Sequence, residues 1–213
     1  DRLDQPQLPL DSAFDTAWTG QGVDVYVLDT GLDPTHSEFG PSVHPRSVLN
    51  IWDASAFHHP LCTPECTGAA LTAKNDVDGH GSHCAGTVAG NTVGVAPSAN
   101  LFGVKVLEDD GLGSFGTMIK AIDFVTSRAK ARGKPSVISM SISGGFYKTI
   151  NSVVDSAVDD GIVVVVAAGN SESDACSYSP ASASKAITVG STTSDDSVSS
   201  FSNYGRCVDI YGP

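Results

Sequence analysis

The chain has 213 residues, of which 17% are charged, and its formal net charge is −12. This length suits one domain over residues 1–213 with a single hydrophobic core, and the composition excludes a disordered chain. The negative charge argues against nucleic acid or an anionic membrane as a partner, and the longest apolar run, Ile162 to Ala168, is too short to span a bilayer.

Apolar spacing predicts alternating strands and helices after a polar surface segment at residues 1–20, which contains Pro6 and Pro9. In chain order the spacing first predicts a strand at 23–28, loops from 40 to 75 with a short strand near 48–52, and a helix of small residues after His80. A strand at 101–107 and a helix from 115 to the stop at Gly133 and Pro135 follow. The last predicted elements are a strand at 136–142, a helix through 150–158, a strand at 162–168 and a strand at 186–189. The run at 162–168 is expected to be buried on both faces of the sheet. Strands that alternate with helices imply right-handed crossovers, so we predict an α/β fold with a mainly parallel central sheet and helices on both faces.

Two polar residues follow predicted strands. Asp29 stands at the end of the first strand, and Asn170 comes just after the strand at 162–168. Because sites in parallel sheets form at the carboxyl ends of the strands, we expect both residues on one rim.

The stretch from Asp76 to Gly90, DVDGHGSHCAGTVAG, places His80 among very small residues. Gly79 and Gly81 flank the imidazole and leave room for substrate and neighbouring backbone, as a side chain that transfers protons requires. A core helix of small residues with a chance histidine is the alternative interpretation of this stretch by itself.

Several separated motifs support the catalytic interpretation. They are YVLDTG at 26–31, DGHGSHCAGT at 78–87, GVAPSANLFGVKVL at 94–107, SMSISGG at 139–145, VVAAGN at 165–170, SYSPAS at 177–182 and SSFSNYGRCVDIYGP at 199–213. Together they resemble the subtilisin-like serine peptidases, or subtilases, and within them the proteinase K-like branch, nearly from end to end. The resemblance implies a subtilisin-like three-layer sandwich, serine endopeptidase activity on proteins or peptides, and no cofactor in catalysis.

By this resemblance, His80 is the general base, Asp29 orients it, and Asn170 donates a hydrogen bond to the oxyanion. A serine hydroxyl needs an imidazole to take its proton, a buried carboxylate to fix the tautomer of that imidazole, and an amide to stabilise the charge on the carbonyl oxygen. Taken singly, Asp29 could accept backbone bonds at a strand end and Asn170 could be a turn residue. Their joint occurrence with His80 favours catalysis.

The resemblance also assigns peptide-binding positions. Two extended segments would hold a peptide between them as an added strand, three small residues would form the wall of the pocket for the residue before the cut, and one ring would line an apolar pocket further upstream. The segments are Gly111, Leu112, Gly113 and Ser141, Ile142, Ser143, the wall is Ala167, Ala168 and Gly169, and the ring is Phe115. Ordinary strand and turn structure is the alternative for each position. The expected specificity is broad, with a leaning to apolar side chains.

Two other peptidase chemistries fit single motifs. His80 and His83 lie one helical turn apart, but zinc peptidase helices use H-E-x-x-H, so we expect a structural role for His83. The DTG at 29–31 also occurs in aspartic peptidases, which need a second such turn, and the chain has no second DTG or DSG.

Five cysteines leave at least one thiol without a partner inside the chain. The expected arrangement is a Cys176–Cys207 disulfide and a buried free thiol at Cys84, both by resemblance, with a short Cys62–Cys66 disulfide. A zinc site that uses His58 and His59 is the alternative for the last pair. Disulfides fit the secreted location that the family implies, for an enzyme that acts as a monomer and meets an inhibitory propeptide.

Calcium is the ion that the resemblance implies, in a structural role. Its ligands would be the carbonyl oxygens of Ser184 and Ala186 and the carboxylate of Asp209, all of them the oxygen ligands that calcium prefers. A surface aspartate beside ordinary loop carbonyls is the alternative.

The family's nucleophile is the remaining element. It lies in a G-T-S-x-A motif beyond the segment that ends at Pro213, and neither this motif nor G-x-S-x-G occurs in the chain. We therefore expect a fragment of a serine endopeptidase, trimmed at both ends, that lacks its C-terminal part and cannot form an acyl-enzyme alone. A non-catalytic subtilase-like module that binds peptides is the alternative function.

Overall fold

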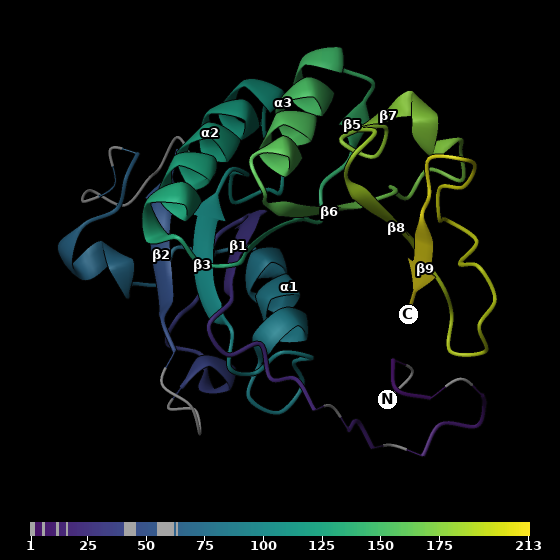
Figure 1. Ribbon diagram of the computed structural model, residues 1–213, viewed down its shortest axis with the longest axis horizontal. Helices are drawn as coiled ribbons and strands as arrows, with labels where there is room; N and C mark the ends of the chain where they lie inside the picture. Colours follow the sequence, from purple (N-terminus) through teal and green to yellow (C-terminus); the bar gives the residue numbers. More distant parts are fainter. Residues whose placement is uncertain are drawn as a thin grey trace.

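The structure, a computed structural model, describes residues 3–5, 7–11, 13–15, 17–40, 46–54, 62 and 64–213 (Figure 1). The strands are β1 (Asp24–Asp29), β2 (Val48–Asp53), β3 (Asn100–Lys105), β4 (Ser136–Met140), β5 (Gly144–Gly145), β6 (Val163–Ala167), β7 (Tyr178–Ser179), β8 (Ile187–Ser191) and β9 (Ile210–Gly212). Within the described residues, a seven-stranded sheet has the order β2-β3-β1-β4-β6-β8-β9, and each neighbouring pair is parallel. The short strands β5 and β7 form a separate antiparallel pair.

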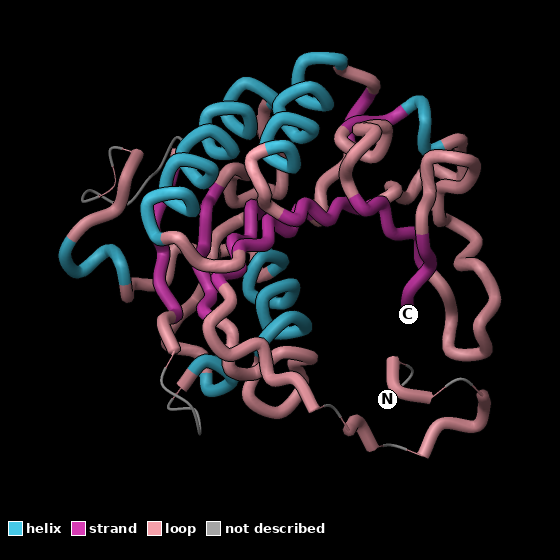
Figure 2. The backbone as a smooth tube through the Cα atoms, in the orientation of Figure 1, coloured by secondary structure: helices cyan, strands magenta, loops and turns pink. Residues whose placement is uncertain are grey.

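Helices lie on both faces of the sheet. Helices α2 (Phe115–Arg132) and α3 (Lys148–Asp159) cover one face, and α1 (His80–Ala89) lies on the other (Figures 1 and 2). Short 3-10 helices are η1 (Ser37–Phe39), η2 (Gly68–Leu71) and η3 (Ala175–Ser177). This arrangement confirms the predicted α/β fold. Among the described residues, no helix is both long and apolar enough to cross a membrane.

Strand β1 supplies both hydrophobic cores because successive side chains of a strand point to opposite faces. Tyr26 and Leu28 belong to the core beneath α2 and α3. Val25 and Val27 belong to the core beneath α1, together with small residues of that helix such as Ala85. The six residues of β1 are all buried, so the strand ends in the interior of the molecule.

Helix α2 begins and ends where the sequence predicts. The side chain of its N-cap residue, Ser114, accepts a hydrogen bond from the Thr117 backbone N–H, which satisfies a free donor of the first turn. Lys130 and Arg132 occupy the last turn, where positive charge interacts favourably with the helix dipole. The helix stops immediately before Gly133.

The strand at 162–168 departs from its prediction. Val164 and Val166 are buried, but Val163 is 47% exposed, and on the neighbouring strand Ile187 is 42% exposed. The prediction that this strand is buried on both faces is therefore wrong. The reason is that α1 packs on β1 and β3, so its cover stops short of β6 and β8.

The predicted surface segment is confirmed where it can be seen. Its described residues are mostly exposed, with Trp18 83% exposed, while Pro6 lies outside the described residues.

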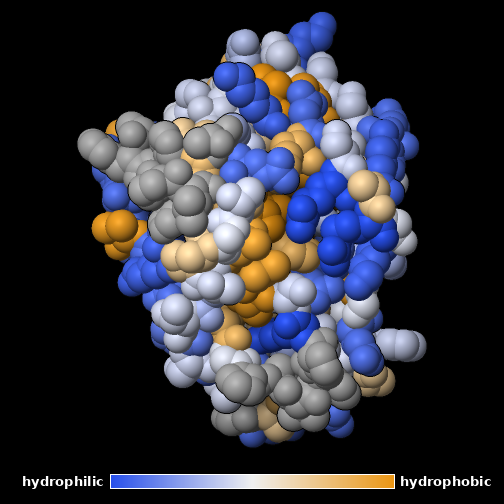
Figure 3. All heavy atoms as spheres, turned by 90° about the vertical axis from the view of Figure 1, so that its left-hand side faces the viewer, coloured by the Kyte–Doolittle hydropathy of each residue, from blue (hydrophilic) through white to orange (hydrophobic). Residues whose placement is uncertain are grey.

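Figure 3 shows the side of the molecule that carries β2, where apolar atoms appear between polar side chains. Although β2 is an edge strand, its last four residues, Asn50 to Asp53, are buried.

Both expected disulfides are present. Cys62 is bonded to Cys66 and Cys176 to Cys207, while Cys84 is free. The first disulfide uses both thiols of the alternative zinc site, and the histidines of that site, His58 and His59, lie outside the described residues.

We predict that the Cys176–Cys207 disulfide contributes more stability than the Cys62–Cys66 disulfide. It joins residues 31 positions apart rather than 4, so it restricts the unfolded chain more strongly. Replacing both Cys176 and Cys207 with Ala should lower the free energy of unfolding by about 3 kcal/mol. Urea denaturation measures this change, and the matched Cys62→Ala, Cys66→Ala variant serves as the comparison. An equal or larger loss in the comparison variant would contradict the prediction.

Candidate active site

Asp29 and His80 lie in direct contact although they are 51 residues apart in the sequence. Asp29 ends β1 and has no exposed surface. Its Oδ1 lies 2.7 Å from His80 Nδ1 and also accepts a hydrogen bond of 2.7 Å from the Thr30 backbone N–H. His80 is the first residue of α1, and its side chain is 48% exposed. A buried carboxylate thus bonds the Nδ1 edge of the ring, and about half of the His80 side chain is open to solvent.

Gly81 allows the helix to approach the turn after β1. A Cβ atom at this position would lie 2.2 Å from the Gly31 carbonyl oxygen and 3.1 Å from the Asp29 Cβ. Real Cβ atoms do not come this close to backbone, so any larger residue would push α1 away from β1. The glycine predicted to give room around His80 therefore makes room for protein backbone.

Asp76 is a buried carboxylate that links the turn after β1 to the start of α1. Its Oδ1 accepts hydrogen bonds from Thr30 Oγ1 at 2.8 Å and from Gly79 N at 2.9 Å. Its Oδ2 accepts from Ser82 N at 2.8 Å and from Ser82 Oγ at 2.6 Å. Thr30 Oγ1 in turn accepts from Gly81 N at 2.9 Å. These bonds fix the two elements that carry Asp29 and His80.

The hydrogen bonds also set the protonation state of Asp76. Burial acts to raise its pKa, but the bonds from Ser82, Gly79 and Thr30 outweigh burial and hold the pKa below the ordinary value of 3.8. The sequence did not indicate this role, because neither of the two aspartates in the DVDGHG stretch gives a sign of partners as distant as Thr30.

We predict that Asp76→Asn lowers the free energy of unfolding by about 3 kcal/mol at neutral pH, because an amide NH₂ would face backbone and hydroxyl donors. The pKa of Asp76 is lowered on folding, so its contribution is present above its ordinary pKa of 3.8 and is lost as the pH falls through the folded value. The difference between wild type and variant should therefore shrink in acid.

Urea denaturation at neutral pH and at pH 3 measures this difference. Asp78→Asn is the matched control, since Asp78 is exposed and accepts one backbone bond, from His80 N at 3.0 Å. A loss for Asp76→Asn no larger than that of the control would contradict the prediction.

Asn170 lies in the turn after β6. It lines a pocket of about 370 Å³ together with Ser141, Ile142, Ser143, Gly144, Gly145, Ala167, Gly169, Ser171 and Tyr178. The turn is held by Asn203, which is fully buried: its Nδ2 donates to the Ala168 carbonyl at 2.8 Å, and its Oδ1 accepts from Ser171 N at 2.9 Å. Asn203 belongs to the SSFSNYG motif, whose structural role was not predicted.

The wall residues of the predicted pocket separate in the structure. Ala167 and Gly169 line the pocket, whereas Ala168 is buried in a small cluster with Ala175 and Ala181. A Cβ atom on Gly169, whose φ is +101°, would lie 2.6 Å from Ser143 Oγ, so the backbone comes very close to the facing segment here.

The other predicted segment is a hairpin at 107–113. Leu107 and Gly113 form an antiparallel bridge, and Leu112, next to this bridge, is 68% exposed. Phe115 follows the hairpin, and its ring lies against Gly144 and stacks on Tyr147 at a centroid distance of 5.6 Å. The ring therefore packs on the residues that follow the predicted segment at 141–143, and Tyr147 is an aromatic neighbour that the sequence did not indicate.

Cys84 lies beside the imidazole, with its Sγ 3.9 Å from His80 Nδ1 and 4.0 Å from Nε2. The thiol is free as expected, but the residue is only partly buried. Burial, with a further contribution from the Asp29 charge, raises its pKa to about 11. At neutral pH the thiol is therefore protonated and a poor nucleophile.

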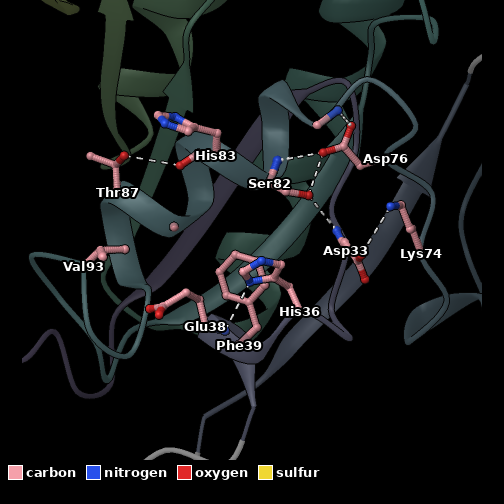
Figure 4. Close-up of a pocket in the computed structure, with 12 residues that line it drawn as sticks. Asp33, His36, Glu38, Phe39, Lys74, Asp76, Ser82, His83, Thr87 and Val93 are labelled. Atoms are coloured by element: carbon pink, nitrogen blue, oxygen red, sulfur yellow. Dashed lines mark hydrogen bonds and ion pairs between the residues drawn. The ribbon is translucent and has the colours of Figure 1, made fainter.

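Asp29, His80 and Cys84 are also the one set of three candidate metal ligands with atoms within 4.8 Å of one another among the residues that the structure describes. His83 does not belong to this set. It is exposed on α1 at the edge of a second hollow of about 500 Å³, between α1 and the η1 loop (Figure 4). The carboxylates there are engaged, for example Glu38 with Thr92 and Asp33 with Lys74.

The predicted calcium ligands lie away from these residues. Asp209 is exposed, and its Oδ2 accepts a hydrogen bond from Thr188 N at 2.8 Å. Ser184 donates its hydroxyl to Asp155 Oδ2 at 2.8 Å, and Ala186 is buried just before β8.

Comparisons with known proteins agree on one family. Residues 20–213 match the Subtilase family. Over 219 aligned residues the chain is 44% identical to alkaline serine exoprotease A of Vibrio alginolyticus. The alignment covers 100% of this chain and 36% of that protein. Over 213 residues it is 44% identical to an extracellular serine proteinase of Thermus sp. (strain Rt41A), with 100% and 47% covered. The chain thus spans less than half of these two relatives.

A solved structure shares the fold. The crystal structure of a cold adapted subtilisin-like serine proteinase matches with a TM-score of 0.85 and 41% sequence identity, and covers 100% of this chain and 70% of that chain.

Proposed function

We infer, because this chain belongs to the subtilase family of serine peptidases, that it supplies the general base, its orienting carboxylate and the oxyanion donor of a serine endopeptidase. The observation that carries the proposal is the 2.7 Å contact between Asp29 Oδ1 and His80 Nδ1. A fully buried carboxylate that bonds a half-exposed imidazole is suited to fixing the orientation of that ring.

In this proposal His80 acts through its second ring nitrogen. The Asp29 carboxylate accepts a hydrogen bond from the Nδ1–H group, so Nε2 is left with a free lone pair directed away from the carboxylate. Nε2 then takes the proton of a hydroxyl nucleophile and later gives it to the leaving amine. Asp29 stabilises the positive charge on the ring between these two steps.

Asn170 acts on the carbonyl oxygen of the substrate. Its side-chain amide can donate to the oxygen as negative charge develops there, which lowers the barrier more than it stabilises the bound substrate. The buried contacts of Asn203 support this role, because they hold the backbone on both sides of Asn170 before a substrate binds.

The nucleophile is proposed to be a serine outside residues 1–213. Within the described residues, no serine hydroxyl makes a hydrogen bond to the His80 ring. Cys84 is close enough to be considered, but with a pKa of about 11 only about one molecule in ten thousand carries the thiolate at neutral pH. The cysteine is therefore an unsuitable replacement.

The proposed substrates are proteins or peptides with apolar side chains near the cut. A peptide would pair with residues 111–113 of the hairpin and with Ser141 to Ser143. One of its side chains would enter the pocket beside Ala167 and Gly169. We also propose secretion, since the Thermus relative is named an extracellular proteinase and two disulfides fit an oxidising compartment. A monomeric state and a propeptide partner stay predictions.

We predict that a fluorophosphonate reagent forms no covalent adduct with the 213-residue chain. The reagent needs a serine that an imidazole has activated, and that serine is proposed to lie elsewhere. Intact-mass spectrometry measures the adduct, and the Vibrio relative serves as the positive control. An adduct on this chain would overturn the proposed location of the nucleophile.

The same reagent separates the two candidate functions in the natural protein that contains this chain. Labelling of a serine outside these residues, abolished by His80→Ala, supports the endopeptidase. Peptide binding without any labelling would instead favour a non-catalytic module.

Calcium is proposed as a structural ion near the start of β8. The donor set is one carboxylate, Asp209, and the carbonyls of Ser184 and Ala186, which fits a hard cation. The bond from Thr188 N occupies one oxygen of Asp209 and leaves the other for a ligand role. The ion would tie the loop before β8 to the segment before β9, with no part in the chemistry.

We predict that removal of calcium with EGTA lowers the melting temperature by about 5 °C, because an ion that binds only the folded chain stabilises it. Asp209→Asn should abolish this difference, whereas Asp123→Asn, an exposed position on α2, should retain it. Differential scanning calorimetry with and without EGTA measures the effect. Equal melting temperatures in wild type would contradict the proposed site.

A further inference from the structure

Lys105 is a buried lysine that the proposed function does not use. It is the last residue of β3, in the apolar motif LFGVKVL, and its side chain is only 3% exposed. An ammonium group removed from water is costly unless it is paired and hydrogen-bonded. The partners of Lys105 therefore indicate what this arrangement holds together.

The first partner belongs to the turn that carries Asp29. Lys105 and Asp29 are neighbours in the parallel register of β3 and β1. Lys105 Nζ donates to the carbonyl oxygen of Thr30, the residue after Asp29. The same Thr30 bonds Asp76 through its hydroxyl, so Lys105 and Asp76 hold one residue from two sides.

The second partner belongs to the hairpin at 107–113. Lys105 Nζ lies 2.9 Å from Asp109 Oδ1, and the Asp109 side chain is 41% exposed. The hairpin is closed by a 2.7 Å bond from Glu108 N to the Leu112 carbonyl. Its base is attached to Asp29, whose carbonyl accepts from Val106 N at 2.9 Å and from Leu107 N at 3.2 Å.

We propose that Lys105 is a positioning residue that fixes the peptide-binding hairpin relative to the turn that carries Asp29. One ammonium group bonds both elements, so a peptide paired with residues 111–113 is held at a set distance from His80. This inference rests on the proposed function, because it assigns the hairpin to peptide binding. The link between hairpin and turn is nevertheless a property of the chain alone, and it can be tested without catalysis.

The decisive variant is Asp109→Asn. It keeps the size of the side chain and removes the charge that Lys105 meets, at a position exposed enough to tolerate the change. Lys105→Met removes both bonds at once. Lys130→Met is the matched control, because this variant loses an ion pair of 2.7 Å between Lys130 on α2 and Asp160, the residue after α3, away from the site.

The first readout is the affinity of the 213-residue chain for an apolar tetrapeptide with blocked ends, measured by NMR titration. Asp109→Asn should weaken binding about fivefold and Lys105→Met about tenfold, while the double variant should be no weaker than Lys105→Met because the two residues act as one unit. Lys130→Met should bind like wild type. Melting temperatures of Asp109→Asn and Lys130→Met should stay within about 2 °C of each other, so a loss of binding is not a loss of fold.

Two further readouts do not depend on peptide binding. Amide hydrogen exchange at 108–113 should accelerate in Asp109→Asn and not in Lys130→Met. The ¹⁵N chemical shifts of the His80 ring should change in Lys105→Met and not in Asp109→Asn, because only the former frees Thr30.

The outcomes separate the two proposals. Failure of the wild type to bind the tetrapeptide would count against the proposed function, and the exchange and ¹⁵N readouts would still decide the link. If folded Asp109→Asn and Lys105→Met kept the peptide affinity, the amide exchange rates and the His80 ¹⁵N chemical shifts of the wild type, the positioning role of Lys105 would be overturned.

Discussion

The hydrogen bond between Asp29 and His80 depends on how closely α1 approaches the end of β1. That approach is set by Gly81, which leaves no room for a side chain, and by Asp76, whose carboxylate bonds both elements. Packing brings the two elements together, and the directional bonds of Asp76 fix their relative position. The geometry of the pair is therefore a property of the buried turn as much as of Asp29 and His80.

The turn that carries Asn170 follows the same principle with different residues. Asn203 fixes the backbone around Asn170 from within, as Asp76 does for His80, and each is buried. In both cases an exposed side chain that can meet a substrate is carried by backbone bonded to a buried polar side chain. Such support reduces the freedom that would otherwise be lost when a substrate binds.

The fold could be predicted from the sequence and the catalytic residues could be proposed from it, whereas the buried residues that support them could not. Apolar spacing identified β1 and α2 because periodicity is a local signal, and ordered motifs pointed to His80 and Asn170. Asp76 and Asn203 bond residues 46 and 35 positions away, and such pairs leave no periodic trace in one sequence. The apolar run at 162–168 misled for a related reason, since composition does not reveal which face a helix will cover.

The uneven cover of the sheet divides the site into two regions of different resistance to local opening. Strands β1 and β3 are packed between helices, whereas, within the described residues, β6 carries helical cover on one face and the face that includes Val163 and Ile187 is exposed. Fluctuations that expose backbone therefore cost less free energy on the β8 side of the molecule. The imidazole and its carboxylate belong to the resistant region, and the Asn170 turn borders the other. Within the described residues, motion should thus alter the turn that carries Asn170 before it alters the contact between Asp29 and His80.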